Sequence, residues 1–182
     1  MTKKKSNKID PIKKEKLKKL FKFFGIFFGI IIVYYLIILI TSNEIFNSYI
    51  NFSASCAGYI LNIFDGKSEV IGNIIKYKQF DTQLSFGCEG TEPLVIFLAG
   101  VLAFPAGIKD KLWGILIGII TLYLLNIIRI VLLILIGSSS PDLFETFHTE
   151  IFPVLFIMIS LMAWLIWVKL SESKKIQSNK MS

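Results

Sequence analysis

The chain has 182 residues, 54% of them hydrophobic, and its mean hydropathy is +0.65. This composition excludes an ordinary soluble domain and is typical of a polytopic membrane protein with one compact bundle of spans. The formal net charge is +7, but ten of the 20 Lys and Arg residues lie between Lys3 and Lys22. Such clustering indicates a cytoplasmic segment beside anionic lipid heads, not a nucleic-acid-binding surface.

The first forty residues predict a basic cytoplasmic segment, 1–20, followed by a first span at about 21–41. The apolar run from Phe23 to Ile40 is too long for the core of a signal peptide, and no small-residue cleavage site follows it. It is close to the roughly 20 residues that a bilayer core requires, so we expect it to be retained as a span. Gly25 and Gly29 have the spacing that lets a second helix approach closely, although chance explains the pair equally well.

An outer segment, 43–90, follows and has two parts. Its first part, 45–64, has the pattern of an amphipathic helix, with polar residues off an apolar stripe at alternating steps of four and three. The stripe comprises Ile45, Tyr49, Phe52, Cys56, Tyr59 and Ile63. We expect this helix to lie flat in the membrane interface, and a re-entrant or spanning segment is the alternative.

The second part begins after the turn signal Asp65-Gly66. Residues 67–87 are rich in β-prone side chains separated by Gly, Asn, Lys, Gln and Asp, and no helical stripe appears. This pattern predicts one small β-hairpin that leads into Cys88.

Three further spans are predicted at about 92–106, 112–137 and 148–170, before a cytoplasmic tail, 171–182. Thr91 is the expected N-cap of the first of them, with Pro93 in its first turn. Gly114 and Gly118 repeat the four-residue glycine spacing in the next. The predicted fold is therefore an all-α membrane protein: a four-span transmembrane helical bundle with an interfacial amphipathic helix and a small outer β-hairpin.

The distribution of Lys and Arg predicts the orientation of this bundle. Ten lie before or at the start of the first span, two at Lys109 and Lys111, and four from Lys169 onward. The positive-inside rule then places these three segments and both termini in the cytoplasm. The outer segment, Cys88 and His148 accordingly lie on the outer face of the cytoplasmic membrane.

Arg129 is the most costly residue in the chain, because a charge at the centre of a span costs about 2.5–3.5 kcal/mol. It lies eight residues before Gly137, or roughly 12 Å along a helix, and Asn126 shares its face. We expect both side chains to face the interior of the bundle. The alternatives are an arginine that extends outward to the interface, or one that pairs with a carboxylate such as Glu92.

His148, the only histidine, lies at the outer end of the last span. Pro153 has no N–H to donate to the carbonyl of Thr149, so the helix is expected to be loosened just after the histidine. An imidazole can act as a general base and then as a general acid near neutral pH. Taken alone, an interfacial histidine that hydrogen-bonds a loop is the more ordinary interpretation.

Cys88 is the candidate nucleophile. It lies near the N-terminus of the 92–106 helix, where the helix dipole and a cation such as Arg129 favour the thiolate, while Glu89 and Glu92 oppose it. Cys56 is also predicted outside, so a Cys56–Cys88 disulfide is the competing interpretation. We favour a free Cys88, because Cys56 falls on the apolar stripe of its helix.

A cysteine, a histidine and an intramembrane arginine thus map to one membrane face, a pattern of nucleophilic acyl transfer. The runs Val70–Ile74, Phe86-Gly-Cys-Glu-Gly90, Leu125-Asn-Ile-Ile-Arg129 and Phe147-His148 resemble the exosortase/archaeosortase family of membrane transpeptidases. The likeness covers roughly residues 45–165, within a transmembrane domain of 21–170. The small size is similar to that of compact members such as exosortase H, whereas Glu89 and the low number of spans depart from the family pattern.

The resemblance implies Cys88 as nucleophile, His148 as general acid/base and Arg129 as stabiliser of the oxyanion or substrate, with Asn126 and Gly90 in support. It implies as substrates secreted proteins whose C-terminus carries a short motif, a transmembrane helix and a basic end, and an acyl acceptor of unspecified identity. Neither a metal nor an organic cofactor is expected. The competing function is a non-catalytic polytopic membrane protein, such as an assembly factor or a small transporter subunit.

Overall fold

The computed structural model describes residues 11–40, 44–85 and 90–181. Helices α1 (Pro11–Ile40) and α2 (Glu44–Asp65) precede three short strands, β1 (Ser68–Ile71), β2 (Ile74–Tyr77) and β3 (Phe80–Gln83). Helices α3 (Thr91–Ala103) and α4 (Ile108–Ser139) follow, and the chain ends with α5 (Pro141–Thr146), the π-helix η1 (Phe147–Ile151) and α6 (Phe152–Met181).

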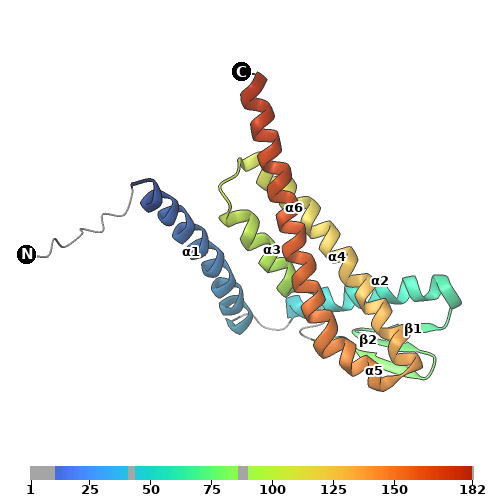
Figure 1. Ribbon diagram of the computed structural model, residues 1–182. Coiled ribbons are helices and arrows are strands. Elements are labelled where there is room, and N and C mark those ends of the chain that lie inside the picture. Colours follow the sequence, from blue (N-terminus) through green and yellow to red (C-terminus); the bar gives the residue numbers. More distant parts are fainter. Residues whose placement is uncertain (1–10, 41–43, 86–89, 182) are drawn as a thin grey trace, which may run out of the picture.

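Helices α1, α3, α4 and α6 run alongside one another as a bundle (Figure 1). Three helical segments are long and apolar enough to cross a membrane: Ile12–Ile40, Ile108–Ser139 and Pro141–Lys174. The predicted span 92–106 forms the 13-residue helix α3, which is only about 20 Å long. The protein is therefore mostly helical with three candidate spans. The second predicted span, 92–106, is not among them, because α3 is too short.

Both ends of α3 have local causes. Gly90, not Thr91, is its N-cap, so the predicted capping residue is wrong and Thr91 is already helical. At the other end, Phe104 adopts an extended conformation (φ −70°, ψ 138°), as the residue before a proline prefers. Pro105 therefore stops α3 at Ala103, three residues before the end predicted at about residue 106.

The last predicted span, 148–170, is part of a longer helical segment that begins at Pro141. Ser140 is the N-cap and is extended, and Pro141 occupies the first helical position, where its missing N–H is not needed. Helices α5, η1 and α6 then follow without an intervening loop.

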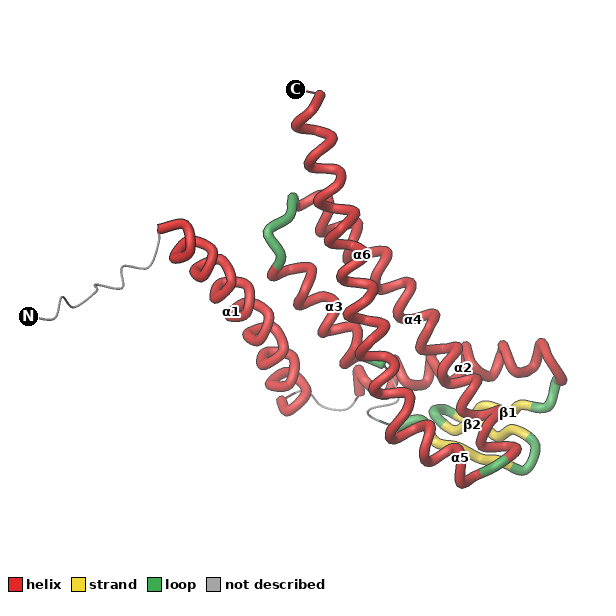
Figure 2. The backbone as a smooth tube through the Cα atoms, viewed as in Figure 1, coloured by secondary structure: helices red, strands yellow, loops and turns green. Residues whose placement is uncertain are grey.

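Helix α2 lies across one end of the bundle, and the three strands lie beneath it (Figures 1 and 2). The predicted apolar stripe is not its buried face, because Phe52, Tyr59 and Ile63 are exposed. The buried face instead carries Ile50, Ser53, Ala54, Ala57 and Leu61. Both faces of this helix contain apolar residues, so periodicity alone does not tell which one contacts protein.

The strands form a three-stranded antiparallel sheet in the order β1-β2-β3, and the prediction of a single hairpin is wrong. Gly72 begins the first turn with a φ of 61°, as expected for a glycine turn. Lys78 begins the second turn with a φ of 57°. Glycine and asparagine are the usual residues at such a φ, and neither is present at this turn to indicate it. The missed turn is therefore the reason that the third strand was not predicted.

One face of the sheet shares a core with α2 and α4. Ile75 and Tyr77 of β2 are almost fully buried there, against Ala54 and Leu61 of α2 and Ile134 of α4. Helix α2 approaches the sheet so closely that a side chain at Gly58 would collide with Val70. The core thus fixes α2 and the sheet to the end of α4 that follows Arg129.

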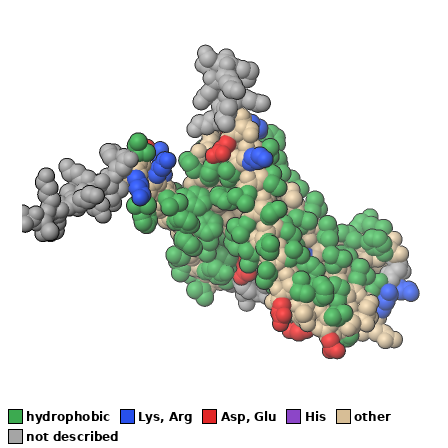
Figure 3. All heavy atoms as spheres, viewed as in Figure 1, with side chains coloured by type: hydrophobic (Ala, Val, Ile, Leu, Met, Phe, Trp, Pro, Cys, Tyr) green, Lys and Arg blue, Asp and Glu red, His purple; other side chains and the backbone are tan. Residues whose placement is uncertain are grey.

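The two ends of the bundle differ in charge. The start of α1, the connection between α3 and α4, and the end of α6 lie at one end, whereas α2, the sheet and α5 lie at the other (Figure 1). Most of the lysine side chains in Figure 3 lie at the first end, acidic side chains gather around α5 at the second, and hydrophobic side chains cover the surface between them. Some acidic side chains also lie at the first end and some basic ones near the sheet. The three basic segments that the sequence groups together therefore lie at the same end of the bundle.

Candidate active site

Four of the five predicted site residues are described. Arg129 and Asn126 lie on α4, His148 lies in η1, and Gly90 is the N-cap of α3. The predicted nucleophile, Cys88, lies outside the described residues, so its position stays a prediction.

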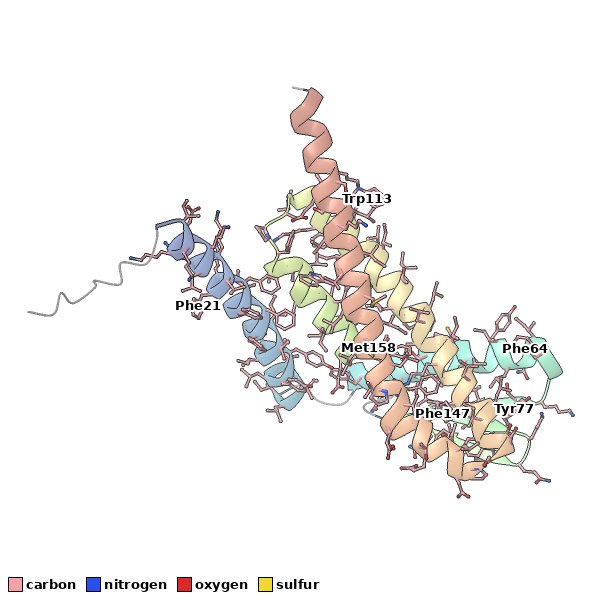
Figure 4. The ribbon with its side chains drawn as sticks, viewed as in Figure 1. Phe21, Phe64, Tyr77, Trp113, Phe147 and Met158 are labelled. Atoms are coloured by element: carbon pink, nitrogen blue, oxygen red, sulfur yellow. The ribbon has the colours of Figure 1, made fainter. Side chains whose placement is uncertain are left out.

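Three of these residues meet at one cavity of about 330 Å³. It lies where the start of α3 faces α4 and the η1–α6 segment, at the end of the bundle where Figure 4 labels Phe147. Its lining comprises Gly90, Thr91, Glu92, Pro93, Arg129, His148, Thr149, Pro153, Phe156 and Ile157. The structure therefore brings the predicted arginine and histidine together with the chain that follows Cys88.

Arg129 points into the bundle and is only 4% exposed. Its guanidinium carbon lies 5.9 Å from the ring centre of Phe152 and 5.4 Å from that of Phe156, both on α6. Aromatic faces attract a cation, and this attraction is stronger where water is excluded. The two rings thus help to hold the buried charge, and the alternative of an outward-reaching arginine is excluded.

Asn126 is 1% exposed and supports the site through Gly90. Gly90 has a φ of 69°, a conformation that side chains rarely adopt, and a Cβ atom there would lie 2.6 Å from the Asn126 side chain. Gly90 can approach α4 this closely because it has no side chain. The contact fixes the end of the segment that carries Cys88 against the helix that carries Arg129.

His148 lies in a single π-helical turn. The N–H of Phe152 donates to the carbonyl of Phe147, five residues back, and Pro153 offers no N–H to the carbonyl of Thr149. The expected loosening near Pro153 is therefore present and includes the histidine itself. The imidazole stacks on Phe144, with ring centres 5.5 Å apart.

Helices α1 and α6 hold the start of α3 from two sides. The Tyr34 hydroxyl lies 2.6 Å from the Thr91 hydroxyl, and Tyr35 donates to the Glu92 carboxylate at 3.2 Å. On α6, the buried Ser160 donates to the carbonyl of Pro93 at 2.6 Å. Sequence reasoning missed these contacts, since tyrosines and a serine within apolar spans are not unusual residue types.

Cys56 lies apart from this cavity. It is a partly buried free thiol on α2, and its sulfur accepts a hydrogen bond from Tyr123 at 3.8 Å. Within residues 11–40, 44–85 and 90–181, no three His, Cys, Asp or Glu side chains are placed to hold a metal ion.

The model of the transmembrane exosortase family (Exosortase_EpsH) matches residues 17–173 of this chain. The chain belongs to the transmembrane exosortase family. Searches among curated proteins and among solved structures found no match. The family match runs from α1 to α6 of this exosortase, so it includes every element that lines the cavity, and it confirms the family suggested by the sequence motifs.

Proposed function

We propose that this exosortase is a membrane-embedded cysteine transpeptidase that cleaves a C-terminal sorting signal of secreted proteins at the outer face of the cytoplasmic membrane. The observation that carries the proposal is the cavity shared by Arg129, His148 and Gly90, in a chain of this family. A buried cation, an imidazole and an adjacent cysteine segment are the groups that thiol-based acyl transfer requires.

Cys88 is the proposed nucleophile. It is two residues from Gly90, and two residues of chain span at most about 7 Å, so the cavity lies within reach of its sulfur. In the first step, His148 accepts the thiol proton and the sulfur attacks the scissile carbonyl carbon. The C–N bond then breaks, the leaving amine takes that proton from His148, and a thioester to Cys88 remains. An acceptor nucleophile then gives a proton to His148 and attacks the thioester carbonyl; the C–S bond breaks, and the proton passes from His148 to the sulfur and restores the thiol.

Arg129 is the proposed electrostatic stabiliser. As the sulfur adds to the carbonyl, negative charge develops on the carbonyl oxygen, and a fixed donor in a water-poor site stabilises that charge strongly. The burial of Arg129 and its position beside the rings of Phe152 and Phe156 give such a donor.

The proposed substrate is a secreted protein with a C-terminal motif, a transmembrane helix and a basic end. Its helix would lie in the bilayer beside the bundle, with its basic end in the cytoplasm and its motif at the outer end, where the cavity lies. Both termini of the exosortase would then be cytoplasmic, in agreement with the positive-inside rule. The proposed reaction uses no cofactor.

The experiment that tests this function is co-expression with such a secreted protein from the same genome, with processing followed by its change in size. Cys88→Ala should abolish processing, because no sulfur is left to form the thioester. Cys56→Ala is the matched control and should process normally, since Cys56 lies outside the cavity. Processing by Cys88→Ala at the wild-type rate would rule out the cysteine mechanism.

Arg129→Lys tests the role of the guanidinium. The variant keeps the positive charge but loses the planar group that donates in a fixed direction and lies against the two phenyl rings. Initial processing rates at equal protein levels should fall by about 100-fold, as for the loss of an oxyanion donor. A rate close to that of the wild type would show that charge alone suffices and would remove the directional role.

A further inference from the structure

A second cavity, of about 290 Å³, lies on the other side of His148. His148 and Thr149 line both cavities, so the second cavity is adjacent to the candidate active site. It lies between the end of β3 and the helices α4 and α5, and its lining comprises Thr82, Gln83, Leu84, Ser85, Ile130, Leu133, Ile134, Phe144, Glu145, His148 and Thr149.

Strand β3 presents an edge to this cavity. It is the last strand of the sheet and pairs only with β2 among the described residues. The N–H of Leu84 donates inward to Asn73 at 2.9 Å, and main-chain groups in an antiparallel ladder alternate in direction. The N–H and C=O groups of Gln83 and Asp81 are therefore directed to the outer edge.

The cavity has an apolar floor and a polar rim. Ile130, Leu133 and Ile134 of α4 form the floor, whereas Thr82, Ser85 and Glu145 contribute polar groups around it. The far end of β3 is closed, because the Phe80 ring packs on Phe144 with ring centres 5.1 Å apart and lies directly against Gly137. An occupant would therefore extend from the Gln83 end of β3 toward His148.

We propose that this cavity binds the extended recognition segment of the substrate as an additional strand on β3. The inference rests on the proposed function and specifies how that substrate is held. Outward main-chain N–H and C=O groups recognise another main chain, and alternate side chains of the added strand would point to the apolar floor. Glu145, as a charged residue of the rim, selects against acidic side chains and anionic groups at this position.

Gln83→Pro is the sharpest test. Proline removes the outward N–H and places a ring at the edge, but the inward bonds between β2 and β3 do not use this N–H. Processing of the co-expressed secreted protein should fall by about tenfold or more. Gln83→Ala removes only the side chain and keeps the outward N–H, so strand addition predicts a clearly smaller loss of processing than for Gln83→Pro, and equal losses would overturn it.

A reaction that needs no peptide separates this inference from the proposed function. In a Cys56→Ala background, the alkylation rate of Cys88 by iodoacetamide should be the same with and without the Gln83→Pro substitution, since the small reagent does not use the edge. Slow processing by Gln83→Pro together with normal alkylation supports strand addition. Normal processing by Gln83→Pro, in a protein that Cys88→Ala inactivates, overturns it and leaves the cysteine mechanism intact.

Discussion

Gly90 is the residue at which backbone conformation and packing impose the same requirement. Its φ of 69° disfavours any side chain, and the nearest atoms to its missing Cβ belong to Asn126. Gly90 belongs to the run Phe86-Gly-Cys-Glu-Gly90, and Asn126 belongs to the run Leu125-Asn-Ile-Ile-Arg129. The two sequence runs that suggested the family therefore contact each other through these two residues.

A double-mutant cycle tests this contact. Gly90→Ala should destabilise the protein by about 1–3 kcal/mol through backbone strain and the collision with Asn126. Asn126→Ala removes the colliding amide, so the double variant should be less destabilised than the sum of the two single variants. Melting temperatures in detergent give the comparison. Strictly additive effects would show that the two residues act separately.

At the residue scale, the sequence revealed the rare residue types and missed the common ones. Arg129 and His148 were predictable because a charge within a span and a single histidine are conspicuous in an apolar chain. Phe152 and Phe156, whose rings lie beside the guanidinium, are two of 16 phenylalanines, and nothing in the pattern distinguishes them. Residues that support a site through packing carry no signal in one sequence.

At the scale of the element, the π-helical turn η1 determines how His148 is presented. A π-helical turn contains one residue more than an α-helical turn of the same length. The residues before it, including His148 and α5, are therefore rotated around the helix axis relative to α6. Pro153 permits this turn, because the carbonyl of Thr149 has no N–H to bind at the usual spacing.

Pro153→Ala should restore that N–H and favour a regular α-helix through residues 147–151. The His148 side chain would then turn by up to about 100° around the helix axis. We expect processing to fall by about 100-fold, as for a misplaced catalytic group, while the melting temperature stays equal or rises. Pro141→Ala is the control, since this proline occupies the first helical position, and its processing should be unchanged.

The glycine pairs of α1 and α4 look alike in sequence but have different surroundings. The position of a Cβ on Gly118 is occupied by the ring of Phe97, which is buried, whereas nothing lies within 4 Å of Gly25 or Gly29. The close approach in α4 is thus made by aromatic side chains of neighbouring helices.

Gly118→Ala should therefore destabilise the bundle by about 1–3 kcal/mol, because the buried Phe97 ring occupies the position of the new methyl group and has to shift. Gly29→Ala should be neutral or slightly stabilising, since alanine is the better helix former. Thermal unfolding of the two variants side by side checks this difference. Equal losses of stability would mean that another helix covers Gly29 in the membrane.

The sequence predicted the positions of the helices and strands along the chain better than it predicted which faces and strands pack together. Length and hydropathy located α2, α3 and α4 to within about four residues, and Gly66 marked the end of α2 with a φ of 63°. Helix α1 begins at Pro11, about ten residues before the predicted span, and α6 continues to Met181 through the predicted tail, because helices extend beyond the apolar core that hydropathy detects. The buried face of α2 and the third strand were missed, because lipid-facing and protein-facing residues are equally apolar and Lys78 is an atypical turn residue.

For the whole molecule, the separation of basic and acidic ends predicts which loops reach which side of the membrane. In a background without Cys56 and Cys88, a cysteine introduced in place of Lys67 should react with a membrane-impermeant maleimide on intact cells. A cysteine in place of Lys109 should react only after the membrane is opened. Both lysines are exposed, so accessibility within the protein does not limit labelling. The opposite pattern would reverse the proposed orientation.

The placement of Arg129 beside the rings of Phe152 and Phe156 has a consequence for the timing of the proposed reaction. A long, mobile side chain must lose rotational freedom when it meets a reacting group, and that loss weakens its effect. Here burial and the adjacent rings of Phe152 and Phe156 restrict the guanidinium in the folded protein. Under the proposed mechanism, the entropic penalty is incurred when the protein folds, so the positive centre would already be aligned when the carbonyl becomes an anion.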